Sequence, residues 1–66
     1  MRATDAHGTP VELTRIAGVP GNGVLRTDRG TIVVEGDLLQ AAGVPAGEAV
    51  VEAPVELLRE AARALD

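Results

Sequence analysis

The sequence predicts a small mixed β/α domain with the element order β-β-β-α-β-α. Three observations predict it. Short runs of β-branched and aliphatic residues alternate with turns rich in Gly in the first half of the chain. The periodicity changes at Gly36-Asp37, where helix-forming residues follow a strand. A last amphipathic run begins after Pro54 and continues to the end of the sequence.

The first half of the chain is expected to form three short strands behind a polar lead-in. Residues 1–9 show no apolar pattern, and we expect them to be flexible. Val11 and Leu13 alternate with polar residues, which predicts the first strand. The Gly-Val-Pro-Gly-Asn-Gly segment and the Asp-Arg-Gly segment are typical of turns. The expected strands cover residues 10–17, 24–27 and 31–34.

A short helix and a fourth strand are expected to follow. Asp37 suits a helix N-cap, and the Leu-Leu-Gln-Ala-Ala segment after it favours a helix. Gly43 stands where a glycine would end this helix. The Pro-Ala-Gly segment at residues 45–47 predicts a turn, and residues 49–53 predict the last strand. Residues 10–53 are therefore expected to form the body of the domain.

Residues 54–66 are expected to form a C-terminal amphipathic helix. Pro54 suits the first turn because the N–H that it lacks would have no partner there. Apolar residues follow at spacings of three and four, and Leu57 and Ala61 widen this stripe. We expect the stripe to dock onto the body of its own chain, with a partner protein as the alternative. The candidate partner-binding residues are Val55, Leu58, Ala62 and Leu65.

The apolar residues of this 66-residue chain are almost all Val, Leu, Ile and Ala, with no Phe, Trp or Tyr. Such side chains fill only a thin core, and small domains usually add a disulfide, a metal or a second copy. No Cys is present and His7 is the single His, which argues against disulfides and a structural zinc site. We therefore expect a homodimer with no metal and no cofactor.

The sequence contains no catalytic motif. Neither Ser nor Cys occurs, which excludes both as nucleophiles. The Gly-rich segment at residues 18–23 lacks the Gly-Lys-Ser/Thr ending of a phosphate-binding loop. The acidic residues at the turns show no spacing that would bring them together. We expect no catalytic residue and a chain that is not an enzyme.

All six basic residues are Arg, and the charge is unevenly distributed. Residues 1–34 carry four Arg against three acids, which gives +1, and residues 35–66 carry two Arg against seven acids, which gives −5. An ordinary solvated acidic surface explains this pattern. The alternative is a bipartite protein whose first half tolerates an anion and whose second half prefers a basic partner.

The localisation is expected to be cytoplasmic. The first residues contain no apolar signal-peptide region, and no run approaches the length of a membrane span. The absence of Cys agrees with a reducing compartment. We expect no contact with a membrane.

Residues 30–52 resemble the swapped-hairpin proteins of the AbrB and MazE type, which are bacterial transition-state regulators and antitoxins. The resemblance covers about one third of the chain. It implies that residues 10–53 form a small cradle-loop β-barrel that is completed or stabilised as a homodimer. The matching features are a strand at residues 32–34, a helix with Leu38, Ala41 and Ala42, a Gly-Val stop at residues 43–44, a Gly-Glu turn at residues 47–48 and a returning strand at residues 50–51.

The same resemblance implies a DNA-binding transcriptional regulator or antitoxin. Members of the family dock basic residues from hairpin strands and loops onto DNA phosphates and groove edges. Arg15, Arg26 and Arg29 are the residues on or beside the first hairpin that suit this role. Solvated charges at strand edges are the alternative explanation. A protein partner, either a toxin or a larger enzyme, is the other kind of partner that we expect.

The same segment is similar to the processing region of aspartate 1-decarboxylase. The residues that match the pattern of that family are Gly30-Thr31-Ile32, Asp37-Leu38-Leu39 and Ala41-Ala42-Gly43. That family makes a pyruvoyl group by cleavage between Gly and Ser. Thr31 would not yield pyruvoyl, so we take the similarity as support for the barrel fold. A non-catalytic protein–protein interaction module is the second functional hypothesis, and a decarboxylase-like enzyme or pseudoenzyme is the third.

Overall fold

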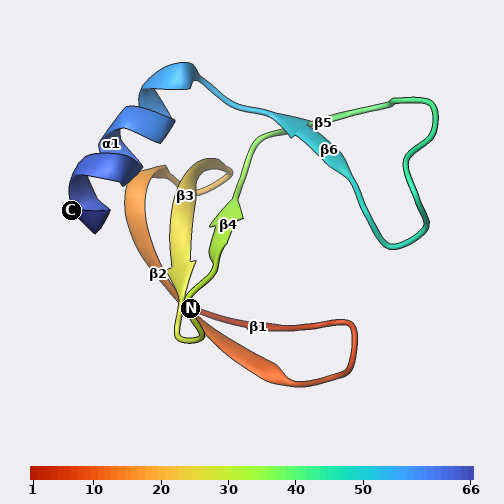
Figure 1. Ribbon diagram of the computed structural model, residues 1–66, viewed down its shortest axis with the longest axis horizontal. Coiled ribbons are helices and arrows are strands. Elements are labelled where there is room, and N and C mark those ends of the chain that lie inside the picture. Colours follow the sequence, from red (N-terminus) through yellow and green to blue (C-terminus); the bar gives the residue numbers. More distant parts are fainter.

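The computed structural model describes residues 1–66 and contains six strands and one helix. Four strands form one antiparallel sheet in the order β1-β2-β3-β4, and β5 and β6 form a separate hairpin (Figure 1). This hairpin extends away from the body that the first sheet and the helix form. The elements are β1 (Arg2–Thr4), β2 (Pro10–Val19), β3 (Asn22–Thr27), β4 (Ile32–Val34), β5 (Asp37–Leu39), β6 (Val50–Glu52) and α1 (Val55–Leu65).

The β2–β3 hairpin is the centre of the fold. Only Pro20 and Gly21 connect its strands, because Val19 pairs directly with Asn22. Pro fixes φ at the first position of such a turn, and Gly21 has the positive φ, +89°, that the second position of a type II turn requires. The strands predicted in the first half of the chain are confirmed, with β2 two residues longer than expected.

A β-bulge at Ile16 reverses the alternation of β2, so that Arg15 and Ala17 point to opposite faces of the sheet. Directly opposed residues of an antiparallel pair share a face. Arg15 is opposite Leu25, whereas Ala17, after the bulge, is opposite Val24 on the other face. Two separate core clusters result. One contains Ala17, Val24, Leu57 and Ala61, and the other contains Val11, Leu13 and Leu25.

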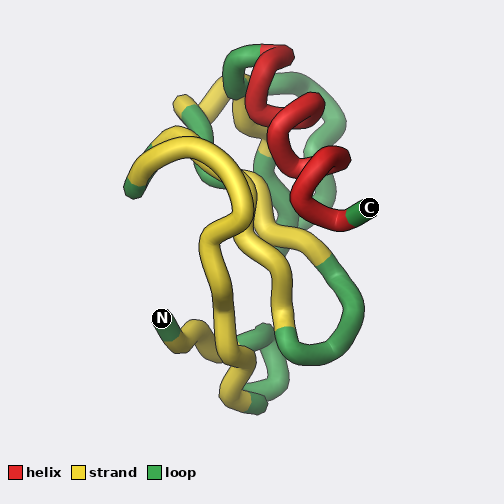
Figure 2. The backbone as a smooth tube through the Cα atoms, turned by 90° about the vertical axis from the view of Figure 1, so that its left-hand side faces the viewer, coloured by secondary structure: helices red, strands yellow, loops and turns green.

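Helix α1 covers the Val24 face of the sheet, and Figure 2 shows it beside the upper part of the strands. Leu57 and Ala61, one helical turn apart, are its buried residues. They fill the space that the small side chain of Ala17 leaves beside Val24. The predicted C-terminal helix is confirmed. It is the single helix of the chain, and it has neither the length nor the apolar character needed to cross a membrane.

The second sheet replaces the short helix that the sequence predicts. The helix prediction over residues 38–42 is wrong, because Leu38 pairs with Val51 and Leu39 with Val50 in an antiparallel hairpin. A helix of one and a half turns is unstable without tertiary packing, and nothing packs on this projecting segment (Figure 1). The turn predicted at residues 45–47 is confirmed by a hydrogen bond from the Glu48 N–H to the Pro45 carbonyl. We call residues 37–52 the arm.

The beginning of the chain is also more ordered than expected. Arg2 lies opposite Glu12 in the β1–β2 pair, and its Nη2 lies 2.8 Å from the Glu12 carboxylate. The Leu13 N–H donates to the Met1 carbonyl oxygen at 2.7 Å. The segment expected to be a flexible lead-in thus contains a short strand, β1, that pairs with β2.

The two sheets do not close into a barrel within one chain. The mixed β/α class is confirmed, but β4 remains an open edge and the arm stands apart. The radius of gyration is 12.6 Å, compared with about 11 Å for a compact chain of this length. Only nine of the 66 residues are buried, so the core is as thin as the composition predicts.

Candidate functional site

Arg15 is the most enclosed of the three candidate DNA-binding residues. Its Nη2 lies 2.8 Å from Glu35 Oε1, and its Nη1 donates to the Val19 carbonyl oxygen at 3.1 Å. Its side chain is 24% exposed. The Glu35 oxygen is buried and lacks an aligned hydrogen bond, so the ion pair with Arg15 is its compensation. A Cβ at Gly23 would collide with the same guanidinium. Arg15 is thus committed to internal partners.

Arg26 lies on the other face of the sheet. It is opposite Thr14 in β2 and Ile32 in β4, which places it on the α1 side, away from Arg15. Its side chain is exposed, and none of the four ion pairs of the chain includes it. Of the three predicted arginines, Arg26 is the one with a free charge.

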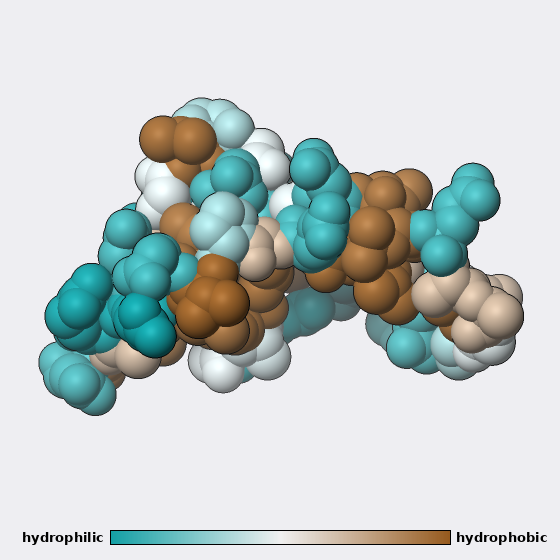
Figure 3. All heavy atoms as spheres, turned by 90° about the horizontal axis from the view of Figure 1, so that it is seen from above, coloured by the Kyte–Doolittle hydropathy of each residue, from teal (hydrophilic) through white to brown (hydrophobic).

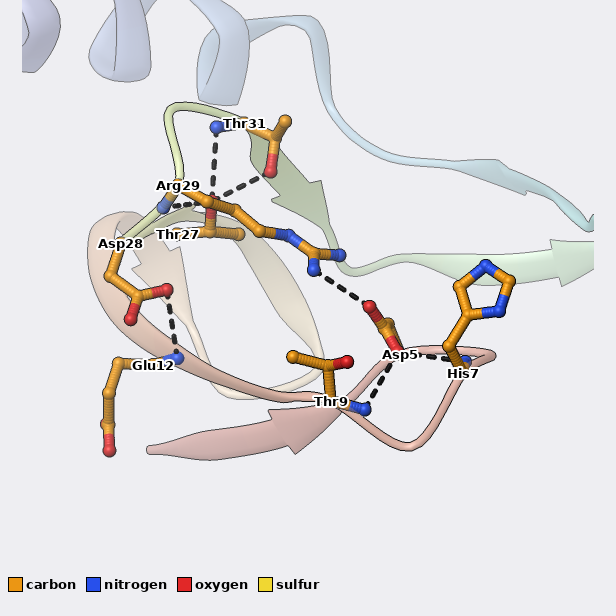
Figure 4. A network of polar contacts seen from close by, with 8 residues as sticks. All are labelled: Asp5, His7, Thr9, Glu12, Thr27, Asp28, Arg29 and Thr31. Atoms are coloured by element: carbon orange, nitrogen blue, oxygen red, sulfur yellow. Dashed lines mark hydrogen bonds and ion pairs between the residues drawn. The ribbon is translucent and has the colours of Figure 1, made fainter.

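Arg29 projects from the β3–β4 turn toward the β1–β2 loop (Figure 4). Its Nη1 donates to Asp5 Oδ2 at 2.8 Å, and its side chain is 50% exposed. Asp5 Oδ1 accepts the backbone N–H groups of Thr9 at 3.0 Å and His7 at 2.9 Å. The hydrogen bond from Arg29, followed by these two backbone bonds, holds the pKa of Asp5 below its usual value. The Asp5 carboxylate therefore ties two distant loops together.

Thr27 organises the turn that carries Arg29. Its buried Oγ1 accepts the N–H groups of Arg29 at 3.2 Å and Thr31 at 3.1 Å, and lies 2.7 Å from the Thr31 hydroxyl. The Asp28 carboxylate accepts the Glu12 N–H at 3.3 Å. The peptide bond between Gly30 and Thr31, which matches the cleavage site of the decarboxylase family, lies in this hydrogen-bonded turn, and Gly30 has a positive φ. Sequence reasoning singled out neither Thr27 nor the anchoring role of Asp5.

The three arginines therefore do not share one face of the chain. Arg15 and Arg26 lie on opposite sides of the sheet, and Arg29 lies in a turn with an acidic partner. The common DNA-binding face considered from the sequence would need a second chain to supply it. Within one chain, Arg26 in β3 and Arg29 in the β3–β4 turn are the two of these arginines whose side chains are exposed.

The candidate partner-binding stripe on α1 is exposed along its whole length. Docking onto the body uses the neighbouring pair Leu57 and Ala61, which the sequence placed at the side of the stripe. The expected docking of the main stripe onto its own chain is therefore wrong. The exposed residues of the stripe are Val55, Leu58, Ala62 and Leu65.

The arm exposes a second apolar surface that sequence reasoning missed. Leu38 is 70% exposed, and its cross-strand partner Val51 is also exposed. Leu39 and Val50 form a second exposed pair on the other face of the arm. The signal was present in the sequence as two apolar doublets, Leu-Leu and Val-Val, which make both faces of a hairpin apolar. Because residues 38–42 are predicted to be helical, the Leu-Leu doublet is not recognised as part of a strand.

A groove joins the arm to α1. It has a volume of about 290 Å³ and lies where the base of the arm meets the sheet and the helix. Figure 3 shows apolar side chains exposed on this side of the molecule, beside the arm. The groove makes the apolar surfaces of the arm and of α1 continuous. Its lining residues are Val24, Val34, Val51, Glu52, Ala53, Pro54, Leu57 and Leu58.

Acidic residues border this apolar surface. Asp37 is directly opposite Glu52 at the base of the arm, and like charges in such a pair are destabilising. None of the ion pairs of the chain involves either residue. A basic group from outside would relieve their repulsion. No three His, Asp or Glu side chains come together in a way that could hold a metal ion.

Comparisons of the chain with protein-family models, with curated proteins and with solved structures gave no match.

Proposed function

We propose that the chain is a homodimeric, non-catalytic protein–protein interaction module. Its arm and the exposed stripe of α1 dock on a basic protein with an apolar surface. The observation that carries this proposal is the continuous apolar surface that runs from the arm through the groove to α1. Exposed apolar surface of this kind marks interaction sites in small proteins.

The arm supports the proposal because it has no stabilising partner of its own. An isolated two-stranded hairpin is marginally stable in water. Full burial of a Leu or Val side chain contributes about 1.5–3 kcal/mol, and four such side chains of the arm are exposed. A partner that covers Leu38 and Val51 would therefore supply the missing stabilisation.

Charge supports a basic partner. Residues 35–66 carry two Arg against seven acids, which gives −5. Asp37 and Glu52 stand opposite each other beside the apolar groove. Cationic side chains at the rim of the interface would neutralise this repulsion and accelerate encounter at low salt. The toxin or larger enzyme expected from the sequence would fit this surface if it carried basic groups around an apolar patch.

A pull-down with Leu38→Asp and Val19→Asp tests the proposal. Both residues are exposed apolar side chains, and Val19 lies at the end of β2, outside the arm. We expect one stoichiometric basic protein to bind the unmodified chain and the Val19 variant, and to be lost with the Leu38 variant and at high salt. Equal recovery by both variants, or no stoichiometric partner, would refute the proposal.

A second candidate is the DNA-binding regulator or antitoxin that the AbrB and MazE resemblance implies. One observation favours it: Arg26 is exposed and unpaired, and Arg29, half-exposed in the β3–β4 turn, offers a second guanidinium group beside its ion pair with Asp5. Doubled in a homodimer, these residues supply four guanidinium groups to phosphates. Guanidinium groups suit phosphate binding because they present several donors in a plane.

A salt-titrated mobility-shift assay on the DNA upstream of the protein's own gene tests this candidate. Arg26→Ala with Arg29→Ala should flatten the dependence of log affinity on log salt by about one unit for each lost phosphate contact. Arg2→Ala is the matched control, because Arg2 is also exposed and also paired with an acid. No binding at low salt, or an unchanged slope in the double variant, would exclude DNA binding through these residues.

A further inference from the structure

Strand β4 presents unpaired backbone groups along one side. In the β3–β4 pair, Thr27 bonds with Thr31, and the Glu35 N–H donates to the Gly23 carbonyl. Hydrogen-bonded and non-hydrogen-bonded residues alternate along an antiparallel pair. Ile32 and Val34 fall at the non-hydrogen-bonded positions, opposite residues 26 and 24. Their N–H and C=O groups therefore point away from β3, toward the open edge of the sheet.

This edge lacks the charges, Pro residues and bulges that protect many edge strands, and only its length of three residues limits pairing. Natural edges are blunted by charges, Pro residues or bulges. Strand β1, at the other edge, has Arg2, whereas residues 31–34 contain no charge and no Pro. The flanking charges are neutralised inside the chain, because Arg29 pairs with Asp5 and Glu35 pairs with Arg15. Two copies of β4 can therefore approach each other without like-charge repulsion.

We propose that β4 pairs antiparallel with β4 of a second copy, about a two-fold axis at Val33. In this register Ile32 lies opposite Val34 of the second copy, and Val33 lies opposite itself. The outward-pointing groups of Ile32 and Val34 then meet as hydrogen-bonded pairs, with four backbone hydrogen bonds across the axis. The result is one continuous eight-stranded antiparallel sheet.

The side chains agree with this register. Ile32 is 53% exposed and Val34 is 38% exposed, although both belong to a strand of strongly β-forming residues. Pairing places Ile32 of one copy beside Val34 of the other on the α1 face, where the two aliphatic side chains are cross-strand neighbours. Because the axis is perpendicular to the sheet, both α1 helices lie on the same side. A second copy is thus the occupant whose backbone and side chains both match this edge.

This inference rests on the homodimer of the proposed function but leaves the arm and its basic partner outside the contact. A disulfide test reports the register directly, because the chain contains no Cys. Val33→Cys should form a disulfide-linked dimer under mild oxidation, since directly opposed non-hydrogen-bonded positions bring the two Cβ atoms within bonding range. Ile32→Cys alone should cross-link poorly, whereas a mixture of Ile32→Cys and Val34→Cys chains should cross-link with each other. Equal cross-linking of all three single variants would overturn the register.

A measurement of the molecular mass in solution tests the pairing of the β4 edges without an introduced Cys. Ile32→Pro removes an N–H that faces the open edge and leaves the β3 pairing intact. In analytical ultracentrifugation it should weaken dimerisation roughly 10- to 100-fold, since two hydrogen bonds of the dimer are lost. Leu38→Lys on the arm should leave the dimer unchanged. A dimer lost in Leu38→Lys and kept in Ile32→Pro would refute edge pairing and leave the homodimer standing; a wild-type monomer at all concentrations would refute both. An unchanged far-UV circular dichroism spectrum identifies the folded variants.

Discussion

Leu57→Ala should detach α1 from the sheet, whereas Leu58→Ala should leave it in place. Leu57 is 7% exposed and belongs to the core cluster on the α1 face, and Leu58 is 59% exposed. Truncation to Ala removes three carbon atoms, which costs about 2–3 kcal/mol at about 0.8 kcal/mol for each buried methylene. Ala17 and Ala61 are too small to refill the space, so a cavity cost adds to this value.

Thermal unfolding followed by far-UV circular dichroism measures the difference. The chain has no Trp or Tyr, so the helical signal is the natural probe. A loss of 2–3 kcal/mol should lower Tm by roughly 10–20 °C in a domain of this size. Leu58→Ala should change the stability by less than about 0.5 kcal/mol, as surface substitutions usually do. A Leu58 variant as unstable as the Leu57 variant would show that the helix docks through the predicted stripe instead.

Three further outcomes are expected. Because its pKa is lower in the folded than in the unfolded chain, the Asp5 carboxylate stabilises the fold above about pH 4, and this contribution is lost as the pH falls further; Asp5→Asn should flatten the acid side of a plot of Tm against pH. Thr27→Val should cost about 1–3 kcal/mol, because two partly buried N–H groups lose their acceptor at about 0.5–1.5 kcal/mol for each hydrogen bond, whereas Thr14→Val, at an exposed position, should be nearly neutral in urea unfolding. In Gly36→Ala, the new Cβ would collide with the Glu52 carbonyl at the base of the arm; hydrogen exchange in β5 and β6 should accelerate while β2 and β3 stay protected.

The fold of the body could be predicted from local patterns, and the arm could not. The strands of the first sheet follow alternation and turn residues, and α1 follows its apolar spacing, so short-range physics decides them. The Leu-Leu-Gln-Ala-Ala segment has helix-forming residues, but Leu38 and Leu39 instead pair with the Val50-Val51 doublet. That partner lies more than ten residues further along the chain, and single-segment propensity contains no information about it.

The candidate site was predicted in its residue types and not in its geometry. The sequence identified Arg15, Arg26 and Arg29 as the basic residues of the first hairpin, but the bulge in β2 puts Arg15 and Arg26 on opposite faces of the sheet. Alternation within β2 alone does not reveal the residue at which the strand turns over. The internal partner Glu35 comes from a segment beyond β4, so only the assembled sheet brings it to Arg15.

The placement of Val24 and Leu25 in separate clusters has a consequence for the fidelity of folding. A strand with one apolar face resists slippage, because a shift by one residue would expose that face. Both faces of β3 are apolar at these two positions, so a strand slipped by one residue would still place an aliphatic side chain in one of the two core sites, Val24 in the place of Leu25 or Leu25 in the place of Val24. Arg26 opposes the slip in either direction, since it would move to the buried place of Thr27 or of Leu25. Correct pairing therefore also depends on the two-residue Pro-Gly turn and on the bulge, which fix the register of β2 and β3 where the hydrophobic pattern alone does not.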